Sequence, residues 1–176
     1  MTRDQFWKII EQSRSEWNSK VADGNMDRQC NELSELLNKL DRDELVSFAT
    51  HYYNVDDEAY HWNLWAAAYI MGGGCSDDGF IDFRAWLISM GKEVFDAALK
   101  DPETLAENGN IPGVECFFFE QFSYVYIRVY EGKFDVEFPD LNLTHSDEPA
   151  GEPFSEDEDE LSKRFPKLFK EFWDDA

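Results

Sequence analysis

The chain has 176 residues, and its 38 Asp and Glu against 16 Lys and Arg give a formal net charge of −22. Proteins bind nucleic acids and anionic membranes through Lys and Arg, so this charge excludes both as partners and favours a basic protein. A hydrophobic share of 43% with 16% aromatic residues excludes a disordered acidic polymer and indicates one folded domain over residues 1–176.

Cysteine usage indicates the compartment. Cys30, Cys75 and Cys116 are odd in number and widely spaced, which is typical of reduced thiols in the cytosol rather than of a disulfide framework or a zinc site. The most apolar stretch, residues 64–71, is far shorter than the roughly 20 residues that span a bilayer. No cofactor-binding motif is found either. We therefore expect a cytoplasmic protein without a metal, a cofactor or a membrane segment.

In chain order, the first predicted element is a helix that begins after Thr2. Thr2 and Gln5 form a capping box, in which each side chain accepts a hydrogen bond from the backbone N–H of the other residue. Phe6, Ile10 and Trp17 then fall at helical spacing. We therefore expect this helix to extend at least to Trp17.

A second helix is predicted over residues 30–40, and a third begins at a capping box formed by Asp41 and Glu44. Residues 54–57 leave two alternatives open: a short break that starts a fourth helix, or one helix that runs through. In either case the glycine run 72–74 ends the helical stretch, because glycine loses the most backbone entropy in a helix.

After a polar turn, helices are predicted over residues 80–90 and 94–99. Residues 114–138 are ambiguous, because their Val, Ile, Phe and Tyr content suits strands, whereas the apolar positions also fit a helical stripe. We favour helix and keep a short hairpin within 114–138 as the alternative. The predicted fold class is all-α, a compact and irregular helical domain.

The last part of the chain is predicted as an acidic loop, residues 139–155, followed by a C-terminal helical segment, residues 156–173. Ser155 and Glu158 form a third candidate capping box. Pro166 suits the first position of a helix, so we expect the helical segment to restart and kink there.

Acidic residues concentrate late in the sequence. Residues 140–160 contain nine Asp and Glu and no Lys or Arg. Carboxylates are favourable at a helix N-terminus, so a solvated helix start is the simplest interpretation of the final run. The functional alternative is a docking surface for a basic partner. The candidate docking residues are Glu156, Asp157, Glu158, Asp159 and Glu160.

Residues 60–91 hold the most distinctive pattern. It comprises a W-x-x-W helix with small residues, a glycine-rich C-S-D-D-G-F turn and an F-R-x-W-L-I-x-x-G helix. In these motifs the chain resembles a bacterial family catalogued as domain of unknown function 4240. The resemblance also covers the opening Phe6-Trp7 and the closing segment from Arg164 to Leu168. It implies a mostly helical cytosolic domain and, because the family has no assigned activity, provides no functional residues to transfer.

The candidate site residues come from this pattern. Its first two tryptophans form an aromatic ridge, and Ser76, Asp77 or Asp78 can cap the helix that follows the glycine turn. We expect a charge-assisted pair between Arg84 and one of these two carboxylates. The full set is Trp62, Trp65, Cys75, Ser76, Asp77, Asp78, Arg84 and Trp86.

A structural role for this set is favoured over a functional one. The functional alternative is a small-molecule or enzymatic pocket at the Gly72–Gly79 turn. There Cys75 would act as a nucleophile only if His61 approached as its base. Adjacent carboxylates in a turn point in different directions, so Asp77 and Asp78 do not predict a metal site. No catalytic residue is assigned.

Three functions follow from these observations. The first is a non-enzymatic acidic binding protein, such as an immunity or inhibitor protein that neutralises a basic toxin or nuclease by electrostatically steered docking. The second is the pocket at the glycine turn. The third is a structural or regulatory interaction domain, for which an exposed apolar patch along residues 114–130 is expected. The charge and the lack of a reaction motif favour the first.

Overall fold

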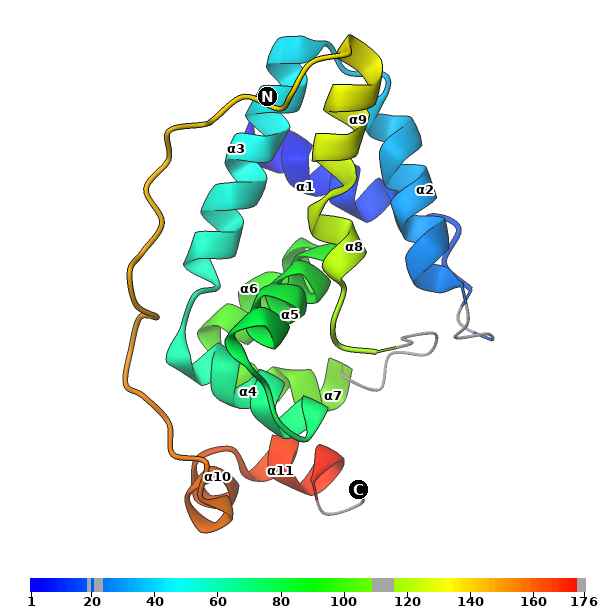
Figure 1. The fold of residues 1–176 in the computed structure, drawn as a ribbon. Helices are drawn as coiled ribbons and strands as arrows, with labels where there is room; N and C mark the ends of the chain where they lie inside the picture. The colour runs from blue at the N-terminus through cyan, green and yellow to red at the C-terminus, as the bar shows by residue number, and fades with distance from the viewer. Residues whose placement is uncertain (19, 21–23, 109–115, 174–176) are drawn as a thin grey trace.

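The computed structural model describes residues 1–18, 20, 24–108 and 116–173. Over these residues the chain forms eleven α-helices, one 3₁₀ helix and no strand, so the all-α class is confirmed (Figure 1). None of the described helices is long and apolar enough to cross a membrane. In chain order they are α1 (Arg3–Gln12), α2 (Asn25–Leu37), α3 (Arg42–Glu58), α4 (Trp62–Gly72), α5 (Asp77–Ser89), α6 (Lys92–Lys100), η1 (Pro102–Thr104), α7 (Leu105–Asn108), α8 (Glu120–Ser123), α9 (Val125–Phe134), α10 (Glu158–Arg164) and α11 (Pro166–Phe172).

Side-chain caps determine where several helices begin. The capping boxes predicted at Thr2 and Asp41 are both present. α10 starts later than predicted, because Asp157 accepts the backbone N–H of Glu160 at 3.1 Å. The prediction that Ser155 caps this helix is wrong, since its hydroxyl instead accepts the backbone N–H of Asp157 at 3.2 Å.

α1 is shorter than predicted and ends at Gln12 instead of reaching Trp17. The hydroxyl of buried Ser13 donates to the carbonyl of Ile10 at 2.6 Å, which competes with the helical hydrogen bond to that carbonyl. The backbone N–H of Arg14 bonds three residues back instead, at 3.2 Å. The chain therefore leaves α1 through tight turns.

α3 runs unbroken through residues 54–57 to Glu58. Phe48, Tyr52 and Val55 are all buried and lie four and three residues apart, so the apolar stripe continues across the polar residues. Neither alternative is fully correct, because the helix passes through residues 54–57 but ends at Glu58, and a separate fourth helix, α4, begins at Trp62.

The described part of residues 114–138 is helical. α8 and α9 occupy most of residues 120–134, and no strand occurs among residues 116–138, so helix is confirmed and the hairpin alternative is wrong. Val125 and Val129 are buried four residues apart, on a helix that packs against α2 and α3. This helical burial outweighs the strand propensity of the β-branched residues.

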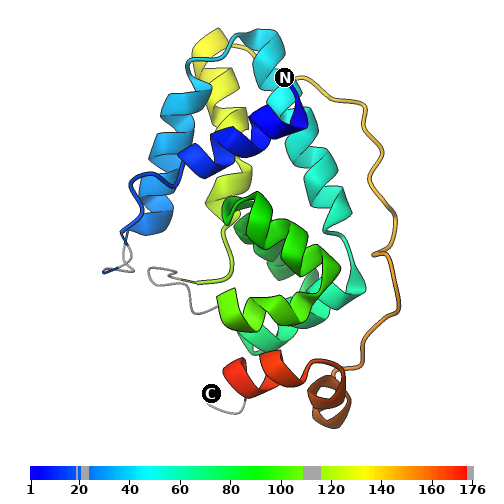
Figure 2. The same ribbon diagram turned by 180° about the vertical axis from the view of Figure 1, so that it is seen from behind.

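α5 lies at the centre of the molecule. Every residue from Phe83 to Ser89 is buried, as is typical of a core helix. α5 packs against α3, α4, α6 and α8. Figures 1 and 2 show α1, α2 and α9 at one end of the molecule and α4, α7 and α11 at the other, with α5 and α6 between them and α3 running along the side.

Residues 139–157 form an extended segment without helices, which we call the strap. It runs along the outside of the molecule from the end of α9 to α10 (Figure 1). A two-way backbone bridge fixes it: Ala150 accepts the N–H of Trp62 at 3.0 Å and donates its own to the carbonyl of Tyr60 at 2.9 Å. The predicted loop is thus tied to the start of α4.

Candidate functional site

A cavity of about 270 Å³ lies where α4, α5 and the strap meet. One wall is an aromatic stack, in which the Trp65 and Phe80 rings lie 4.9 Å apart at an angle of 15°. The Trp65 indole N–H donates to the carbonyl of Cys75 at 3.1 Å, which fixes the ring. The residues that line the cavity are Tyr60, Trp65, Asp77, Phe80, Ile81, Arg84 and His145.

Arg84 is the buried cation of this cavity and is 4% exposed. Its guanidinium carbon lies 4.8 Å from the centre of the Tyr60 ring and 5.2 Å from that of Phe80. Its Nη1 lies 3.4 Å from the backbone oxygen of Asp56 and 3.4 Å from Oδ2 of the same residue. Its Nε is buried and has no hydrogen-bond partner.

The ion pair of Arg84 therefore differs from the predicted one. The expected partner was Asp77 or Asp78 on the same helix, and this prediction is wrong. Asp56 on α3 provides the carboxylate, so the pair connects two helices that lie far apart in the sequence. Asp77 instead lines the other end of the cavity.

His145 brings the strap to the cavity. Its Nε2 lies 3.4 Å from Oδ2 of Asp56, and its Nδ1 lies 3.2 Å from Oδ1 of Asp57. Ser146 adds two hydrogen bonds to the carboxylate of Asp57, at 2.8 and 3.1 Å. The hydrogen bond with Asp56 raises the pKa of His145, as do the carbonyl of Ser146 and the charge of Asp57, whereas burial and Arg84 lower it.

This arrangement predicts that attachment of the strap depends on pH. Because the folded pKa of His145 is raised above its ordinary value of 6.5, the stabilisation is complete below that value and is lost as pH rises through the folded pKa. Proteolytic cleavage within the strap is expected to become faster between about pH 6 and pH 8. The His145→Gln variant is expected to lose this dependence.

The control for this prediction is His51→Gln. His51 lies on α3, where its Nε2 is 3.0 Å from the backbone oxygen of Met1, and it does not line the cavity. This variant should keep the wild-type dependence of cleavage on pH. Equal cleavage of the wild type at both ends of the range would contradict the assignment of the switch to His145.

Most residues of the predicted set do not line the cavity and instead stabilise the fold. Ser76 caps α5 by accepting the N–H of Gly79 at 3.2 Å, as one of the three proposed caps. Trp62 stacks on Trp65 with ring centres 5.2 Å apart, as predicted, whereas the ring of Tyr69, which the sequence pattern places in the same ridge, stacks on Trp173. Asp78 is exposed and does not line the cavity. The structure thus brings Trp65, Asp77 and Arg84 together.

Trp86 is only 1% exposed and lies away from the cavity. Its ring centre is 5.3 Å from that of Phe83 and 5.3 Å from that of Phe117, so it connects α5 to the segment before α8. Trp86 is therefore a core residue.

Cys75 is poorly suited to be a nucleophile. Burial raises the pKa of its thiol to about 12, with further contributions from Asp82 and Asp77, so the thiol stays protonated at neutral pH. His61 caps α4, where its Nδ1 accepts the N–H of Asn63 at 3.2 Å. No hydrogen bond joins His61 to Cys75 in the described chain.

The described residues contain no group of three or more His, Cys, Asp and Glu that could hold a metal ion. The chemistry available at the cavity is recognition: a buried guanidinium, an aromatic wall, an exposed apolar side chain and a carboxylate. All five candidate docking acids are exposed. Glu156 accepts a long hydrogen bond of 3.4 Å from the hydroxyl of Tyr69, and Asp157 caps α10.

The fold and the cavity define a small helical protein with a ligand-sized cleft. The chain belongs to the family described as "Protein of unknown function (DUF4240)", which it matches over residues 1–132. No curated protein and no solved structure matches the chain. The match covers α1 to α8 and most of α9, but neither the strap nor α10.

Sequence reasoning missed five residues of the site: Asp56, Tyr60, Phe80, Ile81 and His145. Asp56 and His145 lie 89 residues apart, so no local pattern indicates their contact. Tyr60 and Phe80 belong to the distinctive pattern but were not singled out as site residues. Ile81 had a usable signal, because Asp77, Ile81 and Arg84 lie four and three residues apart and so share one face of α5.

Proposed function

We propose that the chain is a non-enzymatic binding protein whose acidic surface docks a basic protein. An immunity or inhibitor protein that neutralises a basic toxin or nuclease works in this way. The observation that supports the proposal concerns the Lys and Arg side chains. Several of them contact neutral groups, so many surface carboxylates are not paired with a cation.

Several cations are engaged by neutral groups. Arg14, Lys133 and Arg164 donate to backbone carbonyl oxygens at 2.6 to 3.0 Å. Arg42 lies over the ring of Phe134. A carbonyl or a ring carries no net charge, so these cations cancel few surface carboxylates. In the described parts of the chain, the ion pairs of Lys and Arg are Arg3–Glu58, Arg84–Asp56, Lys92–Asp96 and Lys167–Glu107.

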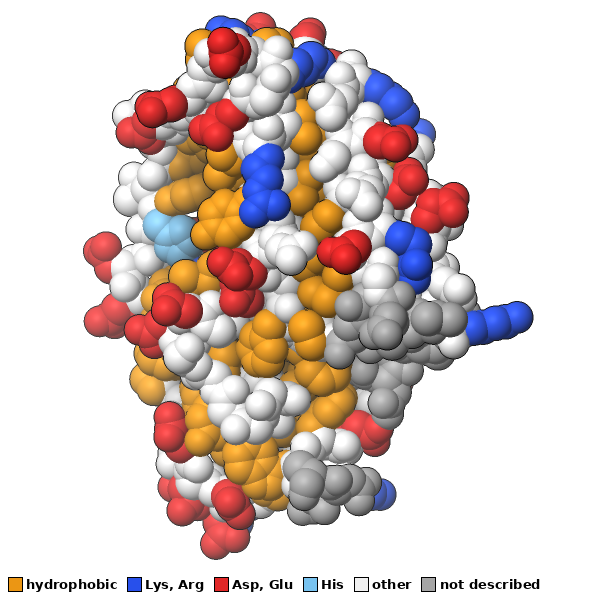
Figure 3. Space-filling view, turned by 45° about the vertical axis from the view of Figure 1, so that its right-hand side comes forward, with side chains coloured by type: hydrophobic (Ala, Val, Ile, Leu, Met, Phe, Trp, Pro, Cys, Tyr) orange, Lys and Arg blue, Asp and Glu red, His pale blue; other side chains and the backbone are white. Residues whose placement is uncertain are grey.

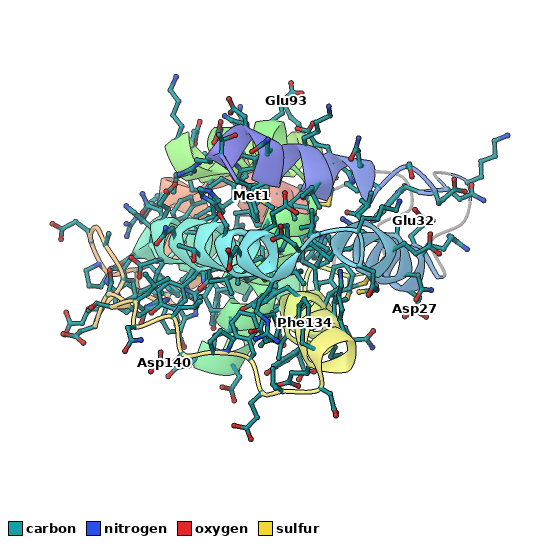
Figure 4. All side chains as sticks on the ribbon, turned by 90° about the horizontal axis from the view of Figure 1, so that it is seen from above. Met1, Asp27, Glu32, Glu93, Phe134 and Asp140 are labelled. Carbon is teal, nitrogen blue, oxygen red and sulfur yellow. The ribbon has the colours of Figure 1, made fainter. Side chains whose placement is uncertain are left out.

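The uncompensated acids lie at the surface, most densely along the strap and at the start of α10. All nine acids of residues 140–160 are exposed. In Figure 3 acidic side chains lie along the left edge and at the lower end and are also spread over the top and the right-hand side, whereas apolar side chains are exposed mainly in the middle. Figure 4 shows Asp27, Glu93 and Asp140 at the periphery, each on a different element. A field of this kind increases the rate at which a basic partner associates.

The other two functions have weaker support. The protonated thiol of Cys75 argues against the enzymatic alternative at the glycine turn. Among residues 116–130, Tyr124 is the one large apolar side chain that is exposed, which is too little for the apolar docking patch. Cys30, Cys75 and Cys116 form no disulfide, so we place the protein and its partner in the cytoplasm.

The triple variant Glu158→Gln, Asp159→Asn, Glu160→Gln tests the docking surface. These residues form the first turn of α10 and are exposed, so the fold should survive their neutralisation. The wild-type chain would first capture basic proteins from a bacterial lysate. The association rate of the strongest purified partner is then expected to fall about 3- to 10-fold in the variant at low salt.

The matched control neutralises Asp27, Asp43 and Glu93. These are also exposed first-turn acids, on α2, α3 and α6, and the change in net charge is the same. The control should lower the association rate less than the α10 variant does. The wild-type rate should also decrease steeply with ionic strength, because salt screens exposed charges. A rate that is independent of salt would contradict the proposal.

A further inference from the structure

The cavity has an ordered arrangement of charge along α5. Asp77, Ile81 and Arg84 lie on one face of the helix, and all three line the cavity. Asp77 and Arg84 are seven positions apart, which corresponds to about 10.5 Å along the helix axis. Between them Ile81 is 47% exposed and presents its apolar side chain to the cavity. The cavity therefore offers an acid, an apolar surface and a base in sequence.

The hydrogen bonds of Arg84 are incomplete. Nη1 has its two long contacts with Asp56, whereas Nε is buried without a partner. A buried N–H without an acceptor is unfavourable, because it has lost its hydrogen bond to water without gaining another. A guanidinium can bind a carboxylate with two parallel hydrogen bonds. Arg84 thus lines the cavity with part of its hydrogen-bonding capacity unused.

The charges around Arg84 limit what can bind there. Asp56, Asp57 and Asp77 supply three carboxylates, against Arg84 and a His145 whose pKa is raised. A simple carboxylate would face Asp77 without compensation, and a simple amine would meet the guanidinium. A molecule that carries both groups, one at each end, matches both ends of the stripe.

We propose that this cavity binds a short zwitterion, such as a dipeptide or an ω-amino acid, with its carboxylate on Arg84, its ammonium on Asp77 and its apolar body against Ile81 and Trp65. The volume of about 270 Å³ is just below the usual range of roughly 300–1,000 Å³ for ligand pockets, so the ligand is small. The site is separate from the acidic surface of α10, and either can exist without the other.

Three compounds of one chain length test the charge requirement: 6-aminohexanoate, hexanoate and hexylamine. Binding is measured by calorimetry and by the NMR shift of the Trp65 indole N–H, which belongs to the cavity wall. The zwitterion is expected to bind about tenfold more tightly than either singly charged compound, because each of those compounds lacks one of the two charge-assisted hydrogen bonds. The dipeptide Ala-Leu should shift the same N–H signal.

Two pairs of variants locate the site without disturbing the core. Asp77→Asn should weaken binding of 6-aminohexanoate about tenfold, whereas Asp78→Asn, which removes the same charge one residue away, should leave it unchanged. Ile81→Glu should abolish binding, because it puts a second acid beside the carboxylate of the ligand. Val136→Glu is its control, since Val136 is 46% exposed and lies outside the cavity.

Three outcomes would overturn the proposal. The first is that no compound shifts the Trp65 signal. The second is that hexylamine or hexanoate binds as tightly as 6-aminohexanoate, which would mean that a single charge suffices. The third is that Asp77→Asn and Asp78→Asn weaken binding equally, which would indicate only a general effect of the acidic surface. None of these outcomes bears on the salt-dependent association of a basic protein, so the two proposals fail independently.

Discussion

Replacing Arg84 by Ala is expected to lower the free energy of unfolding by about 3 kcal/mol. Removing one partner of a buried ion pair costs about 3–5 kcal/mol, because the remaining charge stays buried and unpaired. We expect the low end of this range, since Asp56 retains the contact with His145 and its side chain is 18% exposed. The contacts of the guanidinium with the Tyr60 and Phe80 rings are lost as well. Urea unfolding followed by tryptophan fluorescence measures the change.

A double-mutant cycle separates the ion pair from general packing. Arg84→Met keeps a long side chain in the core, and Asp56→Asn removes the opposing charge. The double variant should be clearly more stable than the sum of the two single changes predicts, because replacing both partners of a buried pair is often close to neutral. Additive costs would show that Arg84 stabilises the fold through packing alone.

The error in the partner of Arg84 shows how far local sequence patterns extend. The candidates on the same helix, Asp77 and Asp78, were chosen for their closeness in sequence. The actual partner, Asp56, lies 28 residues earlier on α3. Only the packing of α3 against α5 brings it near, and such packing leaves no periodic signal in one sequence.

Helices and caps were predictable because they depend on residues three and four positions apart. The boxes at Thr2 and Asp41, the cap at Ser76 and the aromatic ridge of Trp62 and Trp65 are all of this kind. The attachment of the strap was not predictable, since the contacts of His145 span 89 residues. The cavity combines one local face, on α5, with Tyr60 and Trp65 at the start of α4 and with the distant His145, so only part of it could be predicted.

The family match covers only the first part of the chain, and this bears differently on the two proposals. The matched residues 1–132 contain Asp56, Tyr60 and Arg84, and so most of the cavity. His145 and the acids of α10 lie outside the match. We therefore expect a cavity to be a property of the family scaffold, whereas the docking surface that we propose belongs to the C-terminal part of this chain.

Replacing Trp86 by Ala is expected to destabilise the protein by about 3–5 kcal/mol, the usual cost of removing a fully buried Trp or Phe side chain. Trp86 is 1% exposed and packs edge-on against Phe117, which in turn packs against Phe172 of α11. Its loss would therefore open a cavity and weaken the connection between α5 and the C-terminal helix. Urea unfolding measures the cost directly.

Two other tryptophan variants test whether the loss of stability comes from lost packing in the core. Trp86→Phe should cost less than about 1.5 kcal/mol, because the ring contacts partly survive and the buried indole N–H, which has no hydrogen-bond partner, is removed. Trp62→Ala should cost about 1 kcal/mol, since Trp62 is half-buried and loses mainly its stacking on Trp65. If Trp86→Ala destabilised the protein as little as Trp62→Ala does, the core role assigned to Trp86 would be wrong. A large cost confined to Trp86→Ala would instead show that the motif maintains the scaffold on which the cavity is built.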